Sequence, residues 1–548
     1  MIQIVLNKSN FEYDIHSLVK AFYPDQEVKI RTADDAAEGN VIERTDGHNG
    51  SCHSENFTNA QMQSPLFVLK ILYLKEQKSD AAGSLPGSIR FLLFRPEEDQ
   101  AAAAVCDRAV SVDHADRRET KNHLKQTLYQ LMSDYSGRVL PWGTLTGIRP
   151  VRLPMQQLES GADIRAAADF LKKEYFVSEE KAVLAAGIAQ TEREVLARAV
   201  GSRGDRFLQN RESDSLQSPD VEWKLRLLDG YSLYIGIPFC PTTCAYCSFA
   251  SYPAERFSDQ MDLYLDALDQ EIMFASSQMG IHPNTVYIGG GTPTALSAGQ
   301  LDRLLSGVSR RFDLNGVWEF TVEAGRPDSI TEEKLQVLKS YPVSRISINP
   351  QTMKQETLNI IGRRHTVEQF LESYQLARRM GFDNINMDLI VGLPEETPED
   401  VAHTMEEVRK LAPENVTVHS LAIKRAARLR IDREAFRDYQ MINTPEMIDL
   451  TQQACMQMGL FPYYLYRQKN MAGNFENVGY AKPGYEGLYN ILMMEELQSV
   501  IALGAGTVSK RVWPGGRIER CDTVKDLPSY ISRIEEMIER KRKLFTRT

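Results

Sequence analysis

The length, composition and charge of the chain exclude several classes of protein. Its 548 residues exceed the size of a typical single domain, so about two to four domains are expected. Apolar residues make up 42% and charged residues 25%, as in an ordinary folded protein, which argues against global disorder. The net charge of −10 disfavours a nucleic-acid partner, since phosphate contacts need clustered Lys and Arg.

The sequence also predicts the compartment. The first residues lack the basic stretch, apolar core and small-residue cleavage site of a secretory signal peptide. No window approaches the roughly 20 apolar residues of a membrane-spanning helix, so no membrane partner is expected. Apart from one group at 240–247, the seven cysteines are scattered, unlike those of a disulfide framework. We therefore expect a cytoplasmic protein in a reducing environment.

Residues 1–222 are predicted to form an N-terminal extension of two parts. Residues 1–115 have the pattern of a small α+β domain, and residues 116–222 that of a helical region with a polar linker at 201–222. Elements of the first part are expected at Ile2–Leu6, Ile15–Tyr23, Val28–Arg31, Leu66–Leu74 and Ile89–Phe94. Helices of the second part are expected at Leu124–Tyr135, Ile164–Tyr175 and Glu179–Arg198. The role of this extension, as a substrate cap or a donor-docking module, stays open.

Residues 223–440 alternate short apolar runs with amphipathic helical patterns. The runs predict strands at Ser232–Ile237, Thr285–Ile288, Trp318–Val322, Arg345–Ile348, Ile385–Val391 and Val416–Leu421. Strands separated by helices indicate βαβ units with parallel strands and right-handed crossovers. The predicted fold is therefore α/β, with a partial (βα)6 barrel. The alternation stops after about residue 440, and residues 441–548 are expected to form a small C-terminal α/β domain.

Unusual residues follow each of the first five predicted strands. They are Cys240 after the first strand, Gly289–Thr294 after the second, Glu323 after the third, Asn349–Gln351 after the fourth and Gly392–Pro394 after the fifth. Ligands bind outside the carboxyl ends of parallel strands. We therefore expect these residues, together with Asp388 in the fifth strand, to line one mouth.

The three clustered cysteines have the spacing C-x3-C-x2-C directly after a strand. Thiolates select zinc, copper(I) or iron–sulfur clusters. Structural zinc sites and ferredoxin clusters take four protein ligands, whereas this loop offers three and no histidine. Three thiolates on a [4Fe–4S] cluster leave one iron open to a chelating substrate. We favour this interpretation over a chance grouping of buried cysteines.

Each of the other residues expected at the mouth has two possible roles. The triple glycine Gly289–Gly291 lacks the pattern of a P-loop or a dinucleotide fold; it is either a tight turn or a place where the backbone approaches a ligand. Glu323 and Asp388 are either buried carboxylates satisfied by neighbours or ligands for ribose hydroxyls or an amino group. Arg363 is either a solvated side chain or a carboxylate clamp. Position alone leaves these alternatives open.

Taken together, the motifs resemble those of the oxygen-independent coproporphyrinogen III oxidase family of radical S-adenosylmethionine (SAM) proteins. The matching segments are Tyr234–Phe249 with the three cysteines, Gly289–Thr294 and Asp388–Pro394. The resemblance is close over residues 230–425 and continues loosely to about residue 510. The N-terminal extension is similar to that of a longer branch of the family.

This resemblance implies roles for individual residues. The cluster ligands would be Cys240, Cys244 and Cys247. The SAM molecule on the open iron would be contacted by Tyr234, Gly290 and Glu323. A second SAM molecule would be contacted by Tyr246, Gly291, Thr292, Gln351, Arg363, Asp388 and Ala422.

The resemblance also implies an activity and partners. In the family reaction, SAM is cleaved reductively to methionine and a 5′-deoxyadenosyl radical. The radical takes a hydrogen atom from a propionate side chain, carbon dioxide leaves and a vinyl group remains. The expected function is the conversion of coproporphyrinogen III to protoporphyrinogen IX in heme biosynthesis. The expected partners are a tetrapyrrole and an electron donor such as a flavodoxin or a ferredoxin.

Two positions depart from the oxidase pattern. Phe249 stands where the oxidase has a further cysteine, and in this it resembles the heme chaperone branch of the family. The segment Tyr489–Met494, however, lacks the His and Trp with which that chaperone holds heme. A heme-trafficking protein and a radical SAM enzyme acting on heme are therefore alternatives. The basic run Lys424–Arg430 is either a site for substrate carboxylates or a solvated surface.

Overall fold

The computed structural model describes most of the chain and divides it into two compact units. The described residues are 1–24, 26–32, 65–74, 87–95, 104–201, 227–228, 230–280, 282–468 and 475–546. The first unit comprises Met1–Gly147 with Arg165–Val183, and the second comprises Ile148–Ile164 with Leu184–Thr548. Apart from Gly201, the predicted linker lies outside the described residues. The division into four domains made from the sequence stays a prediction.

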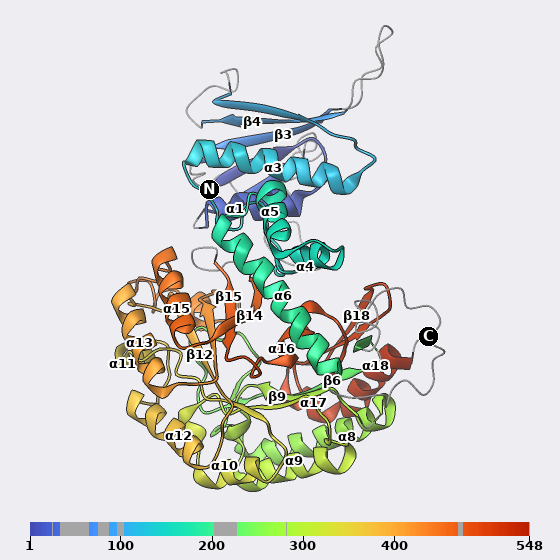
Figure 1. Cartoon of the computed structure of the whole chain (residues 1–548), viewed down its shortest axis with the longest axis vertical. Helices are drawn as coiled ribbons and strands as arrows, with labels where there is room; N and C mark the ends of the chain where they lie inside the picture. The colour runs from blue at the N-terminus through green and yellow to red at the C-terminus, as the bar shows by residue number, and fades with distance from the viewer. Residues whose placement is uncertain are drawn as a thin grey trace, which may run out of the picture. The chain divides into compact units, whose positions relative to one another are not determined.

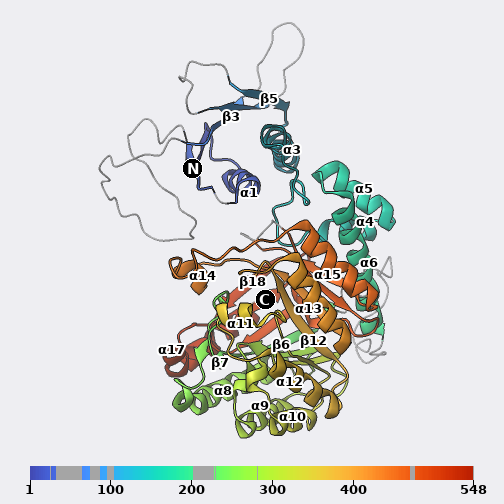
Figure 2. The same cartoon turned by 90° about the vertical axis from the view of Figure 1, so that its left-hand side faces the viewer.

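The first unit is a five-stranded sheet with helices on one face. Its elements are β1 (Ile2–Leu6), α1 (Glu12–Phe22), β2 (Val28–Thr32), β3 (Val68–Leu74), β4 (Ser88–Phe94), β5 (Cys106–Ser111), α3 (Arg117–Ser136) and α5 (Ile164–Tyr175). The strand order is β2-β1-β3-β4-β5, with β1 parallel to both of its neighbours. Figure 2 shows α1 and α3 on the same side of this sheet, where their apolar residues join one core with Ile4, Leu69 and Phe91.

The second unit contains the predicted barrel. Its six parallel strands are β6 (Tyr231–Ile237), β9 (Thr285–Gly290), β10 (Glu319–Glu323), β11 (Arg345–Ser347), β12 (Ile385–Val391) and β13 (Asn415–Ser420). They pair side by side in chain order. The helices between them are α8 (Met261–Met279), α9 (Ala298–Arg311), α10 (Glu332–Lys339), α11 (Gln355–Ile360), α12 (Val367–Arg379) and α13 (Pro398–Leu411). Figure 1 shows most of these helices around the outer side of the curved sheet, which confirms the predicted fold class.

Local sequence signals explain where the barrel helices begin. Helix α9 starts after a capping box in which Ser297 accepts a hydrogen bond from the backbone of Gln300. Thr366 and Thr397 cap α12 and α13 in the same way. Each helix then buries one apolar stripe, such as Leu301, Leu305 and Val308 of α9, against the sheet, and this packing supplies most of its stability.

Strands from the end of the chain extend both edges of the barrel sheet. These strands are β14 (Phe461–Tyr466), β15 (Asn477–Ala481), β16 (Ser499–Leu503), β17 (Val508–Val512) and β18 (Ile518–Asp522). Strand β16 pairs in parallel with β6, and β15 pairs antiparallel with β13. Because β6 and β13 are each paired with these late strands, the barrel stays open, as a partial barrel requires.

The remaining elements connect or cover these parts. They are α4 (Arg152–Glu159), α6 (Glu179–Gly201), β7 (Phe239–Cys240), β8 (Tyr252–Pro253), α14 (Arg428–Ile431), α15 (Pro445–Gln457), α16 (Leu488–Glu495), α17 (Leu527–Ser532) and α18 (Ile534–Thr546). Among the described residues, the helices are too short or too polar to cross a membrane.

A fully buried ion pair holds the last helix against the barrel. Lys541 of α18 donates to Glu271 of α8 over 2.5 Å, and both side chains are shielded from solvent. The second oxygen of Glu271 accepts hydrogen bonds from Tyr530 and from the backbone of Gly504, both 2.7 Å long. Lys541 also donates to Thr523. Every strong polar group here has a partner, as a buried charge requires.

We expect the substitution Lys541→Met to lower the free energy of unfolding of the second unit by about 3–5 kcal/mol, because it leaves the Glu271 carboxylate buried without a cation. Adding Glu271→Gln should recover part of the loss. Urea denaturation, with hydrogen exchange of α18, measures both effects. Lys543→Met, on the exposed side of the same helix, should change stability by less than about 0.5 kcal/mol. Equal effects of the two lysine variants would contradict the importance of the pair.

Candidate functional site

The three clustered cysteines lie in a loop that starts at the carboxyl end of β6. Cys240 belongs to the short strand β7, which pairs with β8. The loop is fixed from two other segments: the Ala245 N–H donates to the Ile361 carbonyl over 2.8 Å, and the Leu429 N–H donates to the Ala245 carbonyl over 2.9 Å. Thr242 donates to the carbonyl of Gly362. The cysteines are therefore presented by an ordered backbone.

Burial disfavours the charged form of two of the clustered cysteines. Cys240, Cys244 and Cys247 are free thiols; Cys244 is buried and the other two are half-buried. Burial raises the pKa of Cys240 and raises the pKa of Cys247 to about 11. The thiolate is the form that binds metal, so these groups need a nearby positive charge, which bound iron would supply.

The number of thiols bears on which metal group the loop would take. Structural zinc sites and ferredoxin clusters take four protein ligands, whereas this loop has the three thiols of Cys240, Cys244 and Cys247. A [4Fe–4S] cluster bound by these three cysteines would leave its fourth iron open to another ligand.

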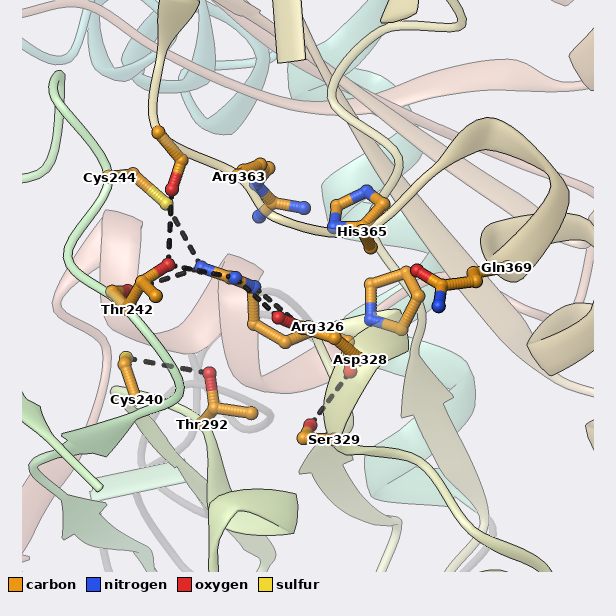
Figure 3. A network of polar contacts seen from close by, with 12 residues as sticks. Cys240, Thr242, Cys244, Thr292, Arg326, Asp328, Ser329, Arg363, His365 and Gln369 are labelled. Carbon is orange, nitrogen blue, oxygen red and sulfur yellow. Dashed lines mark hydrogen bonds and ion pairs between the residues drawn. The ribbon is translucent and has the colours of Figure 1, made fainter. Parts of the chain in front are cut away.

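Arg326 is a buried cation beside the cysteines that the sequence analysis missed. Figure 3 shows its guanidinium between the Cys loop and Asp328. Its Nη1 atom lies 3.5 Å from Cys244 Sγ and 3.1 Å from the Thr242 carbonyl oxygen. Asp328 binds the guanidinium at 2.7 and 3.0 Å. The sequence feature that could have identified Arg326 is a charged residue between Gly325 and Pro327, shortly after the predicted end of a strand.

The triple glycine packs against the Cys loop. A Cβ atom on Gly291 would lie 2.6 Å from the Phe239 carbonyl oxygen and 3.1 Å from Cys240 Sγ. Gly290 has a φ of 102°, a conformation that glycine adopts readily, and a Cβ atom there would meet the Tyr234 hydroxyl at 3.1 Å. Thr292 is buried, with Oγ1 3.5 Å from Cys240 Sγ. Gly291 is thus required by its close approach to the Cys loop, and Gly290 by its backbone conformation and its approach to Tyr234.

Glu323 ends β10 in the middle of a group of tyrosines. Its carboxylate accepts hydrogen bonds from the Tyr287 hydroxyl at 2.5 Å and from the Gly290 N–H at 3.3 Å. The rings of Tyr234, Tyr287 and Tyr489 stack on one another, with centroids 4.5–6.2 Å apart. Burial raises the pKa of Glu323 to about 7 against the opposing effect of the Tyr287 hydrogen bond. A carboxyl group with a pKa of about 7 is only partly ionised at neutral pH, and a cationic ligand beside it would stabilise the ionised form.

Asp388 and Arg363 are joined through Asn349. The Asp388 carboxylate accepts from Asn349 at 2.9 Å and from Asn386 at 2.8 Å, and Arg363 donates to the Asn349 carbonyl at 2.6 Å. Burial opposes ionisation of Asp388, but His419 on β13 and the Asn386 hydrogen bond hold its pKa below the ordinary value. Asp388 is therefore an anion that faces the mouth from β12.

Several buried atoms in this region lack a hydrogen-bond partner in the structure. Among them are Arg363 Nε and Gln351 Oε1, together with both ring nitrogens of His365. Gln351 also has a φ of 69°, a left-handed conformation that a non-glycine residue adopts at a cost. Unpaired buried polar atoms are rare, and a polar ligand such as SAM could satisfy them. Gln351 and Arg363, which both follow β11, therefore fit a polar ligand that contacts the two side chains.

The structure places the sequence-predicted residues along one edge of the barrel. Tyr234 and Gly290 come from β6 and β9, Glu323 ends β10, Gln351 and Arg363 follow β11, and Asp388 lies in β12. Tyr246 lies in the Cys loop beside Arg363, and Ala422 lies two residues after β13. Besides Arg326, the residues that sequence reasoning missed are Tyr287 and His419, whose sequence positions look like ordinary strand positions.

Comparisons with known proteins agree with this geometry. Residues 234–408 match the radical SAM superfamily. The chain is 39% identical over 429 residues to the oxygen-independent coproporphyrinogen-III oxidase-like protein HemZ of Bacillus subtilis, covering 77% of this chain and 81% of HemZ. It is 39% identical over 196 residues to the heme chaperone HemW of the same organism, covering 35% of this chain and 51% of HemW.

A solved structure shows the same likeness at lower identity. Coproporphyrinogen III oxidase (HemN) from Escherichia coli, a radical SAM enzyme, matches with a TM-score of 0.45 and 23% identity, covering 59% of this chain and 74% of HemN. Radical SAM proteins use a [4Fe–4S] cluster and SAM. The similarity to HemZ extends over most of both chains. The protein therefore belongs to the oxygen-independent coproporphyrinogen III oxidase-like family of the radical SAM superfamily.

Proposed function

We propose that Cys240, Cys244 and Cys247 hold the [4Fe–4S] cluster of this protein. The single observation that carries the proposal is the ordered loop of free thiols at the carboxyl end of β6, packed against glycines that leave room beside Cys240. When bound, the cluster and SAM together supply a 5′-deoxyadenosyl radical that can take a hydrogen atom from a substrate carbon. The protein's own residues bind, orient and shield the reactants.

The SAM contacts form two proposed sets. Tyr234, Gly290 and Glu323 would contact the SAM on the open iron; the Glu323 carboxylate, with its raised pKa, gains most from a cationic amino or sulfonium group nearby. The second set lies toward β11, β12 and β13 and would contact a second SAM. Its members are Tyr246, Gly291, Thr292, Gln351, Arg363, Asp388 and Ala422.

We expect Gly291→Ala to reduce the iron and sulfide bound per chain after anaerobic reconstitution by about tenfold. The added methyl group would lie against the Phe239 carbonyl and Cys240 Sγ, so the loop must move away from its binding geometry. Gly299→Ala is the matched control, because a Cβ atom on Gly299 meets nothing within 4 Å and alanine suits its helix. Full iron loading of the Gly291 variant would contradict the proposed place of the cluster.

We propose that the substrate is a tetrapyrrole carrying carboxylates. A segment tied to the Cys loop by the Leu429–Ala245 hydrogen bond exposes the cationic residues Lys424, Arg425 and Arg428. The ring of Phe249, 67% exposed, lies 5.8 Å from Lys424 Nζ. An exposed aromatic ring beside several cations is complementary to a flat macrocycle with anionic side chains.

The reaction we propose is the oxidative decarboxylation of coproporphyrinogen III propionates to vinyl groups. The 5′-deoxyadenosyl radical would take a hydrogen atom from the propionate β-carbon. One electron would then pass from the substrate radical to an external one-electron acceptor, as the C–C bond to the carboxylate breaks to give carbon dioxide and the vinyl group. The cationic segment would hold the carboxylates, and the buried Glu323 and Asp388 would keep the SAM molecules in place. An external one-electron donor such as a flavodoxin or a ferredoxin would reduce the cluster.

The deciding experiment is anaerobic reconstitution of the full chain, followed by incubation with SAM, a reductant and coproporphyrinogen III. We expect protoporphyrinogen IX and 5′-deoxyadenosine together. Formation of 5′-deoxyadenosine alone would remove the substrate assignment and leave the radical machinery intact. Mass spectrometry of products formed from heme would reveal an enzyme that acts on the heme ring.

The second candidate is a heme-trafficking protein that keeps the cluster. The exposed Phe249 and the similarity to HemW over 196 residues favour it. Spectral titration with heme separates the two functions. Tight stoichiometric binding without turnover of coproporphyrinogen III would favour trafficking.

The double variant Arg425→Gln and Arg428→Gln should raise the KM for coproporphyrinogen III by about tenfold or more, since each guanidinium lost removes a charge-assisted hydrogen bond to a carboxylate. Cleavage of SAM without substrate should stay within about twofold. Arg437→Gln, an exposed arginine of the same segment already paired with Glu434 and Asp438, is the control. An equal rise in KM for the control would show that net charge, not this surface, is responsible.

A further inference from the structure

Arg326 is one of two buried arginines beside Cys244; the other is Arg363. Arg326 is 3% exposed, and its Nη1 atom faces Cys244 Sγ at 3.5 Å, as Figure 3 shows. The thiol of Cys240, in contrast, has the neutral hydroxyl of Thr292 at the same distance. The charges around the Cys loop are therefore uneven, with buried cations at Cys244 and a neutral partner at Cys240.

We propose that Arg326 is a positioning residue that stabilises the reduced form of the cluster and so raises its reduction potential, an inference that rests on the proposed cluster site. Reduction adds one electron from an external low-potential donor and makes the cluster more negative by one charge; no bond breaks and no proton moves. A guanidinium held at a ligand sulfur interacts more favourably with the more negative state. Charge and hydrogen bonds at ligand sulfurs are known means of setting cluster potentials.

The backbone and two partners fix the guanidinium before any cluster binds. The Arg326 carbonyl accepts from the N–H of Ser329 at 3.0 Å and from its hydroxyl at 2.7 Å, which holds the turn after β10. The Asp328 carboxylate accepts hydrogen bonds from Nε and Nη2 of the guanidinium. The carbonyl and the hydroxyl of Thr242, in the Cys loop, accept hydrogen bonds from Nη1 and Nη2. Little reorganisation is then needed when the charge on the cluster changes.

Arg363 lies near the same cysteine but has a different role. Its guanidinium donates to the Asn349 carbonyl and also contacts Tyr246 and Cys244, while its Nε atom has no partner in the structure. In the proposed function Arg363 contacts SAM, so its charge would interact with SAM as well as with the Cys loop. Arg326 is instead bound on one side by Asp328 and on the other by the Cys loop, so its charge acts on the cluster whether or not SAM is present.

Asp328 provides a test with the opposite sign. Its carboxylate partly neutralises Arg326, with the two groups 2.7 Å apart. Removing the arginine charge should make the cluster harder to reduce, whereas removing the aspartate charge should make it easier. General damage to the loop would not produce shifts in opposite directions.

The experiment is a redox titration of the reconstituted full chain, followed by electron paramagnetic resonance of the reduced cluster. For Arg326→Gln we expect the ratio of reduced to oxidised cluster at a fixed potential to fall at least tenfold, which is about 59 mV for one electron. Asp328→Asn should raise the ratio, and Arg326→Lys, which keeps the charge, should restore part of the loss.

The outcomes separate this proposal from the proposed function. A cluster of full iron content with an unchanged potential in both Arg326→Gln and Asp328→Asn would overturn the role of Arg326 and leave the cluster site standing. If Arg326→Gln binds no cluster, Asp328→Asn decides: a raised potential supports the proposal, and an unchanged or lowered one overturns it. Failure of the unaltered chain to bind iron and sulfide would instead overturn the cluster site itself.

Discussion

The parallel pairing of β6 with β9 is the constraint on which the site depends. The register sets Gly236 opposite Gly289 and Ile237 opposite Gly290, so that the Cys loop and the glycine turn leave the sheet side by side. The Gly291 N–H then donates to the Ile237 carbonyl, and the Thr292 N–H donates to the Phe239 carbonyl. Because these hydrogen bonds continue the pairing beyond the two strands, Cys240 lies against the glycine backbone at Gly291. A shift in register would separate the cysteines from the residues proposed to bind SAM.

The same pairing extends through the other barrel strands to bring charges of opposite sign to one edge. Glu323 and Asp388 are anions supported by tyrosine, asparagine and backbone donors, while Arg326 and Arg363 are cations next to the Cys loop. Buried charges of this kind are costly unless each has a partner. Most have partners within the chain, and the unpaired atoms of Arg363 and Gln351 lie where a ligand is proposed to bind.

Strands from the last part of the described chain extend the barrel sheet at both edges. Strand β16 covers the β6 edge, β15 covers the β13 edge, and Tyr489 of α16 stacks on the ring of Tyr287 inside the site. The segment Tyr489–Met494, which departs from the chaperone pattern in the sequence, therefore contributes a ring to the group around Glu323.

The amino-acid sequence by itself determined the barrel and the nature of its mouth. Periodic apolar runs are local signals, so β12 and α5 begin and end where the sequence predicts, and the spacing of Cys240, Cys244 and Cys247 needs no tertiary contact to be recognised. Only the tertiary structure decided that β16 lies beside β6 and that Arg326 lies beside Cys244, since these partners are separated by long stretches of chain. Such contacts depend on packing between distant segments, which leaves no periodic trace in the sequence.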